Sequence, residues 1–179
     1  MAVTIEHKIP GEPWDDSQGM AIALRDVGAN IPTLEQYGTS GLWYPNFDAI
    51  GDKLVFSLQV PHGYKVGSDV VFHVHWKSST SSANTVKWQI TYQWVDVNDD
   101  FNSTTSTTDT VEDTPIINQH QIAAFSTISG TGMGISSALN GNLSRITNAA
   151  TDYTGEVYLI FADFHFQRDT VGSRTALAK

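Results

Sequence analysis

Two segments near the middle of the chain alternate between apolar and polar residues, and they constrain the fold more than any other feature. The first, VVFHVHW, spans residues 70–76, and the second, VKWQITYQW, spans residues 86–94. A period of two, rich in β-branched and aromatic side chains, indicates half-buried strands. The polar residues KSSTSSANT between them predict a surface loop that joins an antiparallel pair. We therefore expect Trp76, Trp88 and Trp94 on the apolar faces, and His73 and His75 on the opposite face of the first strand.

Further segments with strand character follow the same pattern on either side of this pair. Residues 134–146 contain Gly141, which indicates a bulge or bend within a strand. Residues 155–169 begin with apolar side chains on both faces, which favours a central position in a sheet. The other predicted strands lie in residues 51–60, 105–111 (an exposed edge) and 117–130. With roughly seven to nine strands and little or no helix, the fold class is all-β, and we expect a jelly-roll-like antiparallel β-sandwich.

Residues 1–50 differ from the remainder of the chain, because glycine and proline recur too closely for long elements. We expect a long irregular N-terminal segment in residues 1–50 and the β-sandwich domain in residues 51–179. The segment contains several large apolar side chains, so it either wraps its own domain or docks as an arm on a neighbouring subunit. Alternation does not assign Trp43 and Tyr44 to the core, which makes them candidates for an interface or a sugar-binding platform.

The charge balance and the absence of cysteine exclude several classes of protein. The formal charge of −9, from 19 acidic and 10 basic residues, argues against nucleic-acid binding through phosphate neutralisation. Without cysteine the chain has no disulfide and no thiolate metal site. The first residues show no basic region followed by an apolar run, and no window resembles a membrane span, so we expect neither a signal peptide nor a membrane contact.

His73 and His75 share one face of their strand, at a spacing that allows two imidazoles to bind one metal ion. Gly67 precedes them at the position of the glycine that opens the metal-binding motif of cupin jelly rolls. The glutamate of that motif is missing, since residues 77–81 read KSSTS, and the second cupin segment is also missing. A cupin-like metal-binding protein is therefore the weakest of the functions that we consider.

Asp163, His165 and Gln167 form a second polar face on the last predicted strand. If this strand lies beside the strand of His73, the side chains of His73, His75, Asp163 and His165 meet. Such a cluster can hold a metal, but we expect instead a polar network on a sheet face or a subunit interface. No nucleophile elbow, phosphate loop, HExxH helix or dinucleotide-binding fingerprint occurs in the sequence. We therefore expect no enzymatic activity, no cofactor and no bound metal.

Four segments in this order resemble a family of small virion structural proteins of tailed bacteriophages and prophages. They are PHGYKVGSDVVFHVHW, KWQITYQW, ISGTGMGISSALNGNLSRI and DFHFQRDTVGSR. The resemblance covers residues 52–174, and the matched positions are His62, Lys65, His73, His75, Trp76, Asp163, His165, Gly172, Ser173 and Arg174. It implies a non-enzymatic β-sandwich protein in which these residues fix strand pairing and subunit contacts.

The size and expected fold favour one role within this family, a capsid cement or decoration protein that stabilises the shell. Such a protein is made in the host cytoplasm and lies on the capsid surface of the virion. The implied partners are further copies of the chain, with a trimer favoured, and the major capsid protein or other virion proteins. The alternative is a tail or head–tail junction component that carries a glycan-binding face.

Overall fold

The structure, a computed structural model, describes residues 11, 13–22, 30–102 and 106–172. Within these ranges the chain forms ten strands and no α-helix, which confirms the predicted all-β class. Among the same residues, no helix has the length and apolar character needed to cross a membrane. The strands are β1 (Trp14–Ile22), β2 (Thr33–Gln36), β3 (Trp43–Asn46), β4 (Lys53–Gln59), β5 (Val70–Ser78), β6 (Val86–Val95), β7 (Thr107–Asp113), β8 (Gln121–Ile128), β9 (Ala138–Ile146) and β10 (Val157–Gln167).

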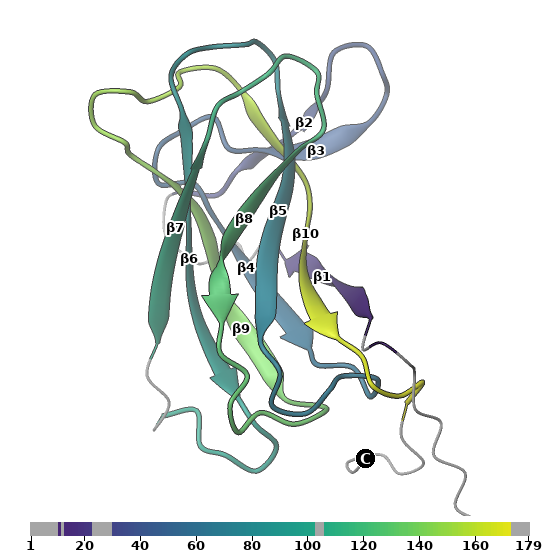
Figure 1. The fold of residues 1–179 in the computed structure, drawn as a ribbon. Coiled ribbons are helices and arrows are strands. Elements are labelled where there is room, and N and C mark those ends of the chain that lie inside the picture. Colours follow the sequence, from purple (N-terminus) through teal and green to yellow (C-terminus); the bar gives the residue numbers. More distant parts are fainter. Residues whose placement is uncertain (1–10, 12, 23–29, 103–105, 173–179) are drawn as a thin grey trace, which may run out of the picture.

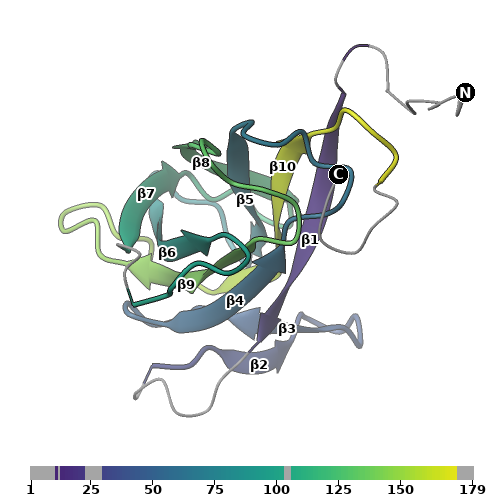
Figure 2. The same cartoon turned by 90° about the horizontal axis from the view of Figure 1, so that it is seen from below.

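The strands form a jelly-roll-like sandwich of two antiparallel sheets (Figure 1). One sheet runs β8–β5–β10, and both β1 and the β2–β3 hairpin lie on the far side of β10. The other sheet runs β4–β9–β6–β7. Strand β1 connects the two sheets, because residues 14–19 pair with β10 and residues 20–22 pair with β4 (Figure 2). One long strand therefore closes this side of the sandwich and covers two sheet edges.

The core lies between the sheets and is rich in aromatic side chains. Strand β5 buries Phe72 and Trp76, and β6 buries Trp88. The rings of Trp76 and Trp88 meet edge-to-face with centroids 6.1 Å apart, a favoured aromatic geometry. The alternation seen in the sequence is thus explained by burial of one face of each strand.

The expected pairing of these two strands is wrong. Strand β5 pairs with β10 and β8, whereas β6 pairs with β7 and β9 in the opposite sheet. The polar loop between them therefore crosses from one sheet to the other instead of closing a hairpin. Alternation specifies which face of a strand is buried, but two apolar faces can meet across a core as well as side by side.

The other predicted strands correspond to β4, β7, β8, β9 and β10. Within the part of the chain that the structure describes, β7 pairs only with β6 and is an edge, and β10 is central, as predicted. Gly141 does not form a bulge, because β9 keeps its register with both neighbours. A Cβ at Gly141 would lie 2.4 Å from the carbonyl oxygen of Thr91 and 2.8 Å from the ring of Phe56. The glycine therefore permits close packing within a regular strand.

The description of residues 1–50 as irregular needs correction for the part that the structure describes. Strands β1, β2 and β3 all lie in this segment, and β1 pairs along two other strands of the sandwich. This part of the segment therefore wraps its own domain, which was one of the two alternatives. The sequence did not reveal β2 and β3 because they are only four residues long, nor β1 because WDDSQGMAI shows no apolar alternation.

Candidate functional site

The two polar faces predicted from the sequence meet on the outer face of one sheet. Strands β5 and β10 are antiparallel neighbours, and Asp163 lies directly opposite His73 in their register. Phe161 lies opposite His75, and His165 is the next outward-facing residue along β10. Since side chains alternate across a strand, the residues between them, Phe164 among them, face the core. The sequence pattern located the correct face, and strand pairing assembled the cluster.

Asp163 is the centre of this cluster. Its Oδ1 lies 3.4 Å from Nε2 of His75 and 3.8 Å from Nδ1 of His73. The ring of His165 packs edge-on against that of His73, with centroids 4.0 Å apart. The Asp163 side chain is only 4% exposed, whereas that of His165 is 34% exposed. The cluster is thus closed at the carboxylate and open to solvent at His165.

Two residues that the sequence analysis did not single out contact ring nitrogens of His165 and His75 that point away from Asp163. Asp16 of β1 places a carboxylate oxygen 2.7 Å from Nε2 of His165. His120, which precedes β8, places its Nε2 2.8 Å from Nδ1 of His75. The ring of His75 also stacks on Phe161, with centroids 4.1 Å apart. Both residues are distant from their partners in sequence, and only strand pairing brings them to the site.

Burial controls the ionisation of the cluster. It raises the pKa of the Asp163 carboxyl, while the neighbouring His165 and His73 act in the opposite direction. Burial likewise lowers the pKa of His73, with His165 adding to the effect, and lowers the pKa of His75, with His120 adding to it. At neutral pH both imidazoles are therefore neutral, the form in which a ring nitrogen can accept a hydrogen bond or ligate a metal.

The polar network expected at this face is incomplete. Three buried polar atoms of this cluster make no hydrogen bond: Oδ1 of Asp163, Nδ1 of His73 and Nε2 of His75. The separations of 3.4 and 3.8 Å within this group are too long for good hydrogen bonds. Buried polar groups without partners are rare in proteins, so this part of the cluster requires an explanation.

Three side chains of the cluster have the arrangement of a metal site. His73, Asp163 and His165 each offer one ligand atom, and these atoms lie within 4.8 Å of one another. Gly67, which suggested a cupin motif, has φ of +78° and a Cβ there would meet open space. Its role is therefore the left-handed turn ahead of β5.

The other candidate residues lie apart from this cluster. Nε2 of His62 is 3.1 Å from Oγ of Ser136, and the backbone N–H of Lys65 donates to Gln167. Trp43 is exposed, whereas Tyr44 is half-buried against Lys77. Arg174 lies outside the described residues. The contact roles assigned to these residues stay predictions.

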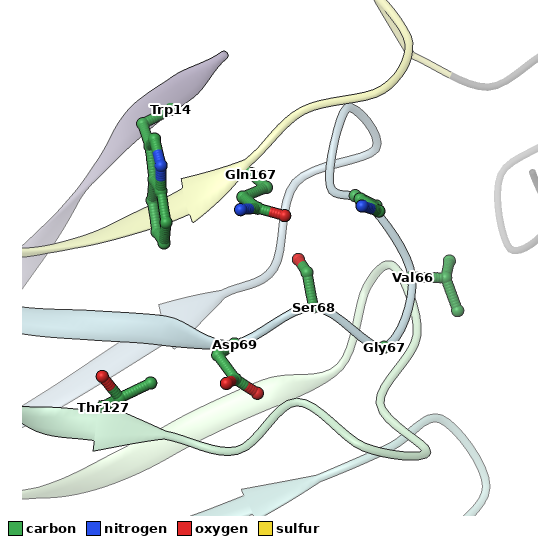
Figure 3. Close-up of a pocket in the computed structure, with 8 residues that line it drawn as sticks. Trp14, Val66, Gly67, Ser68, Asp69, Thr127 and Gln167 are labelled. Atoms are coloured by element: carbon green, nitrogen blue, oxygen red, sulfur yellow. The ribbon is translucent and has the colours of Figure 1, made fainter. Parts of the chain in front are cut away.

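A groove of about 500 Å³ lies at the end of the same sheet and was not anticipated from the sequence. Figure 3 shows the indole of Trp14 beside Gln167, with Ser68, Asp69 and Thr127 around the same space. The Trp14 side chain is half-exposed. An aromatic ring beside several polar groups resembles the general composition of a small-ligand site.

Comparisons with known proteins give similarity only to solved structures. No protein-family model matches the chain, and no curated protein matches it. The chain is similar to a structure of the N-terminal endo-1,4-β-D-xylanase 10B of Clostridium thermocellum, which holds CBM22-1 and GH10 modules complexed with xylohexaose. The sequence identity is 8% over 91% of this chain, and the TM-score is 0.40. The chain spans only 27% of that protein. It is also similar to TmCBM61 in complex with β-1,4-galactotriose, with 12% identity over 87% of this chain and 89% of the other, and a TM-score of 0.31.

Proposed function

We propose that this protein is a non-enzymatic virion structural protein of a tailed bacteriophage or prophage, and that it acts as a capsid cement or decoration protein. The observation that carries the proposal is the β2–β3 hairpin, which is attached to β10 at the margin of the sandwich (Figures 1 and 2). Leu34, Leu42 and Trp43 of this hairpin are 63%, 56% and 59% exposed. Large apolar side chains grouped in this way are typical of a protein-binding surface.

The register of the hairpin places its apolar side chains on one face. Leu34 lies opposite Pro45, and Gln36 lies opposite Trp43, so Leu34 and Trp43 project to the same side. The other face carries Glu35 and Tyr44, which are partly covered by the sandwich. Only the outward face is thus available to a partner.

The inward face holds the hairpin rigidly in place. Nδ2 of Asn46 donates to Glu35, and its Oδ1 accepts from the N–H of Val157 in β10. The hydroxyl of Tyr37 donates to Asn118. A contact surface that is held in place before binding loses less conformational entropy on association, and a central tryptophan is a frequent source of binding energy.

The oligomeric mass tests this proposal. We expect light scattering to give a trimeric mass for the purified chain, because the resemblance implies self-association. Trp43→Asp should shift the chain towards the monomer, whereas the control Phe101→Asp, at an exposed phenylalanine outside the hairpin, should remain trimeric. A monomeric wild-type chain, or a trimer unaffected by Trp43→Asp, would contradict the hairpin contact.

The location in the particle is tested separately by counting copies in purified virions with quantitative mass spectrometry. A shell protein covers a large repeated surface, so we expect on the order of hundreds of copies per particle, as the symmetry of a capsid requires. A dozen or fewer copies would place the chain in the tail or at the head–tail junction.

The groove at Trp14 favours a second candidate function, the glycan-binding tail component. Sugars stack on exposed aromatic rings and bond to polar groups such as those of Asp69 and Gln167. A glycan array probed with the purified chain tests this function. Saturable binding that Trp14→Ala abolishes would support it, and the absence of any binding would exclude it.

A further inference from the structure

We propose that His73, Asp163 and His165 form a binding site for one divalent transition-metal cation, with zinc as the best-suited ion. Their ligand atoms lie within 4.8 Å of one another on the outer face of the β1–β10–β5 region. The site is complete within one chain and lies apart from the contact face of the β2–β3 hairpin. It therefore does not depend on the proposed virion function.

The donor set determines the class of cation. Two imidazole nitrogens and one carboxylate oxygen suit zinc and neighbouring transition metals, whereas calcium and magnesium prefer all-oxygen sites. Three protein ligands leave one position of a tetrahedral ion open. His165 is the most exposed of the three side chains, so this position would face solvent on its side of the cluster.

The unpartnered atoms at the cluster provide an independent indication of a ligand. Asp163 is 2% exposed as a residue, yet its Oδ1 has no hydrogen-bond partner, and Nδ1 of His73 has none either. The two atoms are 3.8 Å apart, which is too far for a direct bond but fits two ligands of one ion. A cation between them would compensate for the desolvation of both atoms.

The surroundings of the site already hold the ligands in position. The carboxylate of Asp16 lies 2.7 Å from Nε2 of His165 and would orient the ring so that Nδ1 faces the ion. A carboxylate behind a ligating histidine is the usual arrangement in metal sites, because it fixes the tautomer and raises the basicity of the ligand. His75 approaches the same oxygen of Asp163 at 3.4 Å, and His120 holds the other nitrogen of its ring. Asp16 is thus a positioning residue, and His75 is the nearest additional nitrogen.

Metal titration of the purified full chain, stripped with a chelator, tests the site. We expect isothermal titration with zinc chloride to give one ion per chain, and cobalt chloride to produce the visible absorption bands of a tetrahedral complex. Asp163→Asn should abolish saturable binding, and Asp16→Asn should weaken it about 10- to 100-fold, as loss of an outer partner does in other metal sites. The matched control is His62→Gln, at a histidine outside the cluster, which should bind as the wild type does.

The outcomes distinguish binding of the ion at this cluster from adventitious binding to other histidines of the chain. Circular dichroism of each metal-free variant verifies folding, and the half-exposed His165→Gln replaces Asp163→Asn if that variant does not fold. No stoichiometric binding by the wild type would overturn the proposal. Unchanged binding by both Asp163→Asn and His165→Gln, or loss of binding in His62→Gln, would also overturn it, because the ion would then bind elsewhere.

Discussion

Two buried ionisable groups, one in each sheet, differ in how many hydrogen bonds the protein gives them. Arg145 of β9 is 2% exposed, and the two terminal nitrogens of its guanidinium donate to the backbone carbonyls of Phe47, Asp48, Tyr153 and Gly155, while its Nε makes no hydrogen bond. Asp163 of β10 is equally buried, yet its Oδ1 accepts no hydrogen bond. These hydrogen bonds connect Arg145 to the loop that follows β3 and to the loop that precedes β10. Among the described residues, Oδ1 of Asp163 has only the long contacts to the two histidines, which distinguishes a structural group from a candidate ligand.

The largest expected effect is at the structural group. Arg145→Met should lower the free energy of unfolding by about 4 kcal/mol, because it leaves several buried carbonyl oxygens without a donor. Urea unfolding followed by tryptophan fluorescence measures this loss. A loss below about 1 kcal/mol would mean that water replaces the guanidinium and that Arg145 does not fasten the loops.

A second satisfied group, Tyr64, should make stability depend on alkaline pH. Burial raises the pKa of its hydroxyl to about 12, and the hydroxyl donates to the carbonyl of Ser68. The pKa of Tyr64 in the folded chain lies above its unfolded value near 10. The contribution of the protonated hydroxyl to the free energy of unfolding is therefore fully present below pH 10 and is lost as the pH rises towards 12. Between about pH 9 and pH 11 the wild type should lose roughly 1 kcal/mol more than Tyr64→Phe. Equal losses in urea unfolding would refute the assignment.

Lys77 offers a smaller test. The sequence analysis assigned this residue to the polar loop after residue 76, and that assignment is wrong. Lys77 belongs to β5, and its Nζ lies 3.6 Å from the ring centroid of Tyr37 and 3.7 Å from that of Tyr44. Removing two cation–π contacts should make Lys77→Ala less stable by about 1 kcal/mol. The comparison with Lys77→Met, which keeps most of the packing, isolates the charge. Equal stability of Lys77→Ala and the wild type would show that the contacts contribute nothing.

The smallest effect is expected at Asp163 in the absence of metal. Asp163→Asn should change the free energy of unfolding by less than about 1 kcal/mol in either direction, because Oδ1 has no hydrogen bond to lose. Chelator-treated proteins in urea provide the measurement. A loss comparable to that of Arg145→Met would mean that the carboxylate is structural, and the contrast between the two sheets would disappear.

Sequence periodicity predicted the positions of β4, β5, β6 and β10 within a few residues, because alternation records which side chains are buried. It could not predict that β5 and β6 face each other across the core, since their patterns allow either arrangement. It located His73, His75, Asp163 and His165 as polar faces. It missed Asp16 and His120, whose positions depend on long-range strand pairing. It also missed Arg145, because nothing in the local pattern distinguishes a buried arginine from an exposed one.

The most direct test of the central claim is a crystal structure of the zinc-soaked protein, with anomalous scattering recorded at the zinc edge. We predict one strong peak at about 2.0–2.2 Å from Oδ1 of Asp163 and from one ring nitrogen each of His73 and His165. The carboxylate and imidazoles should move together around the ion. A map without a peak at Asp163, with its Oδ1 bonded to water or to a neighbouring side chain instead, would contradict the account.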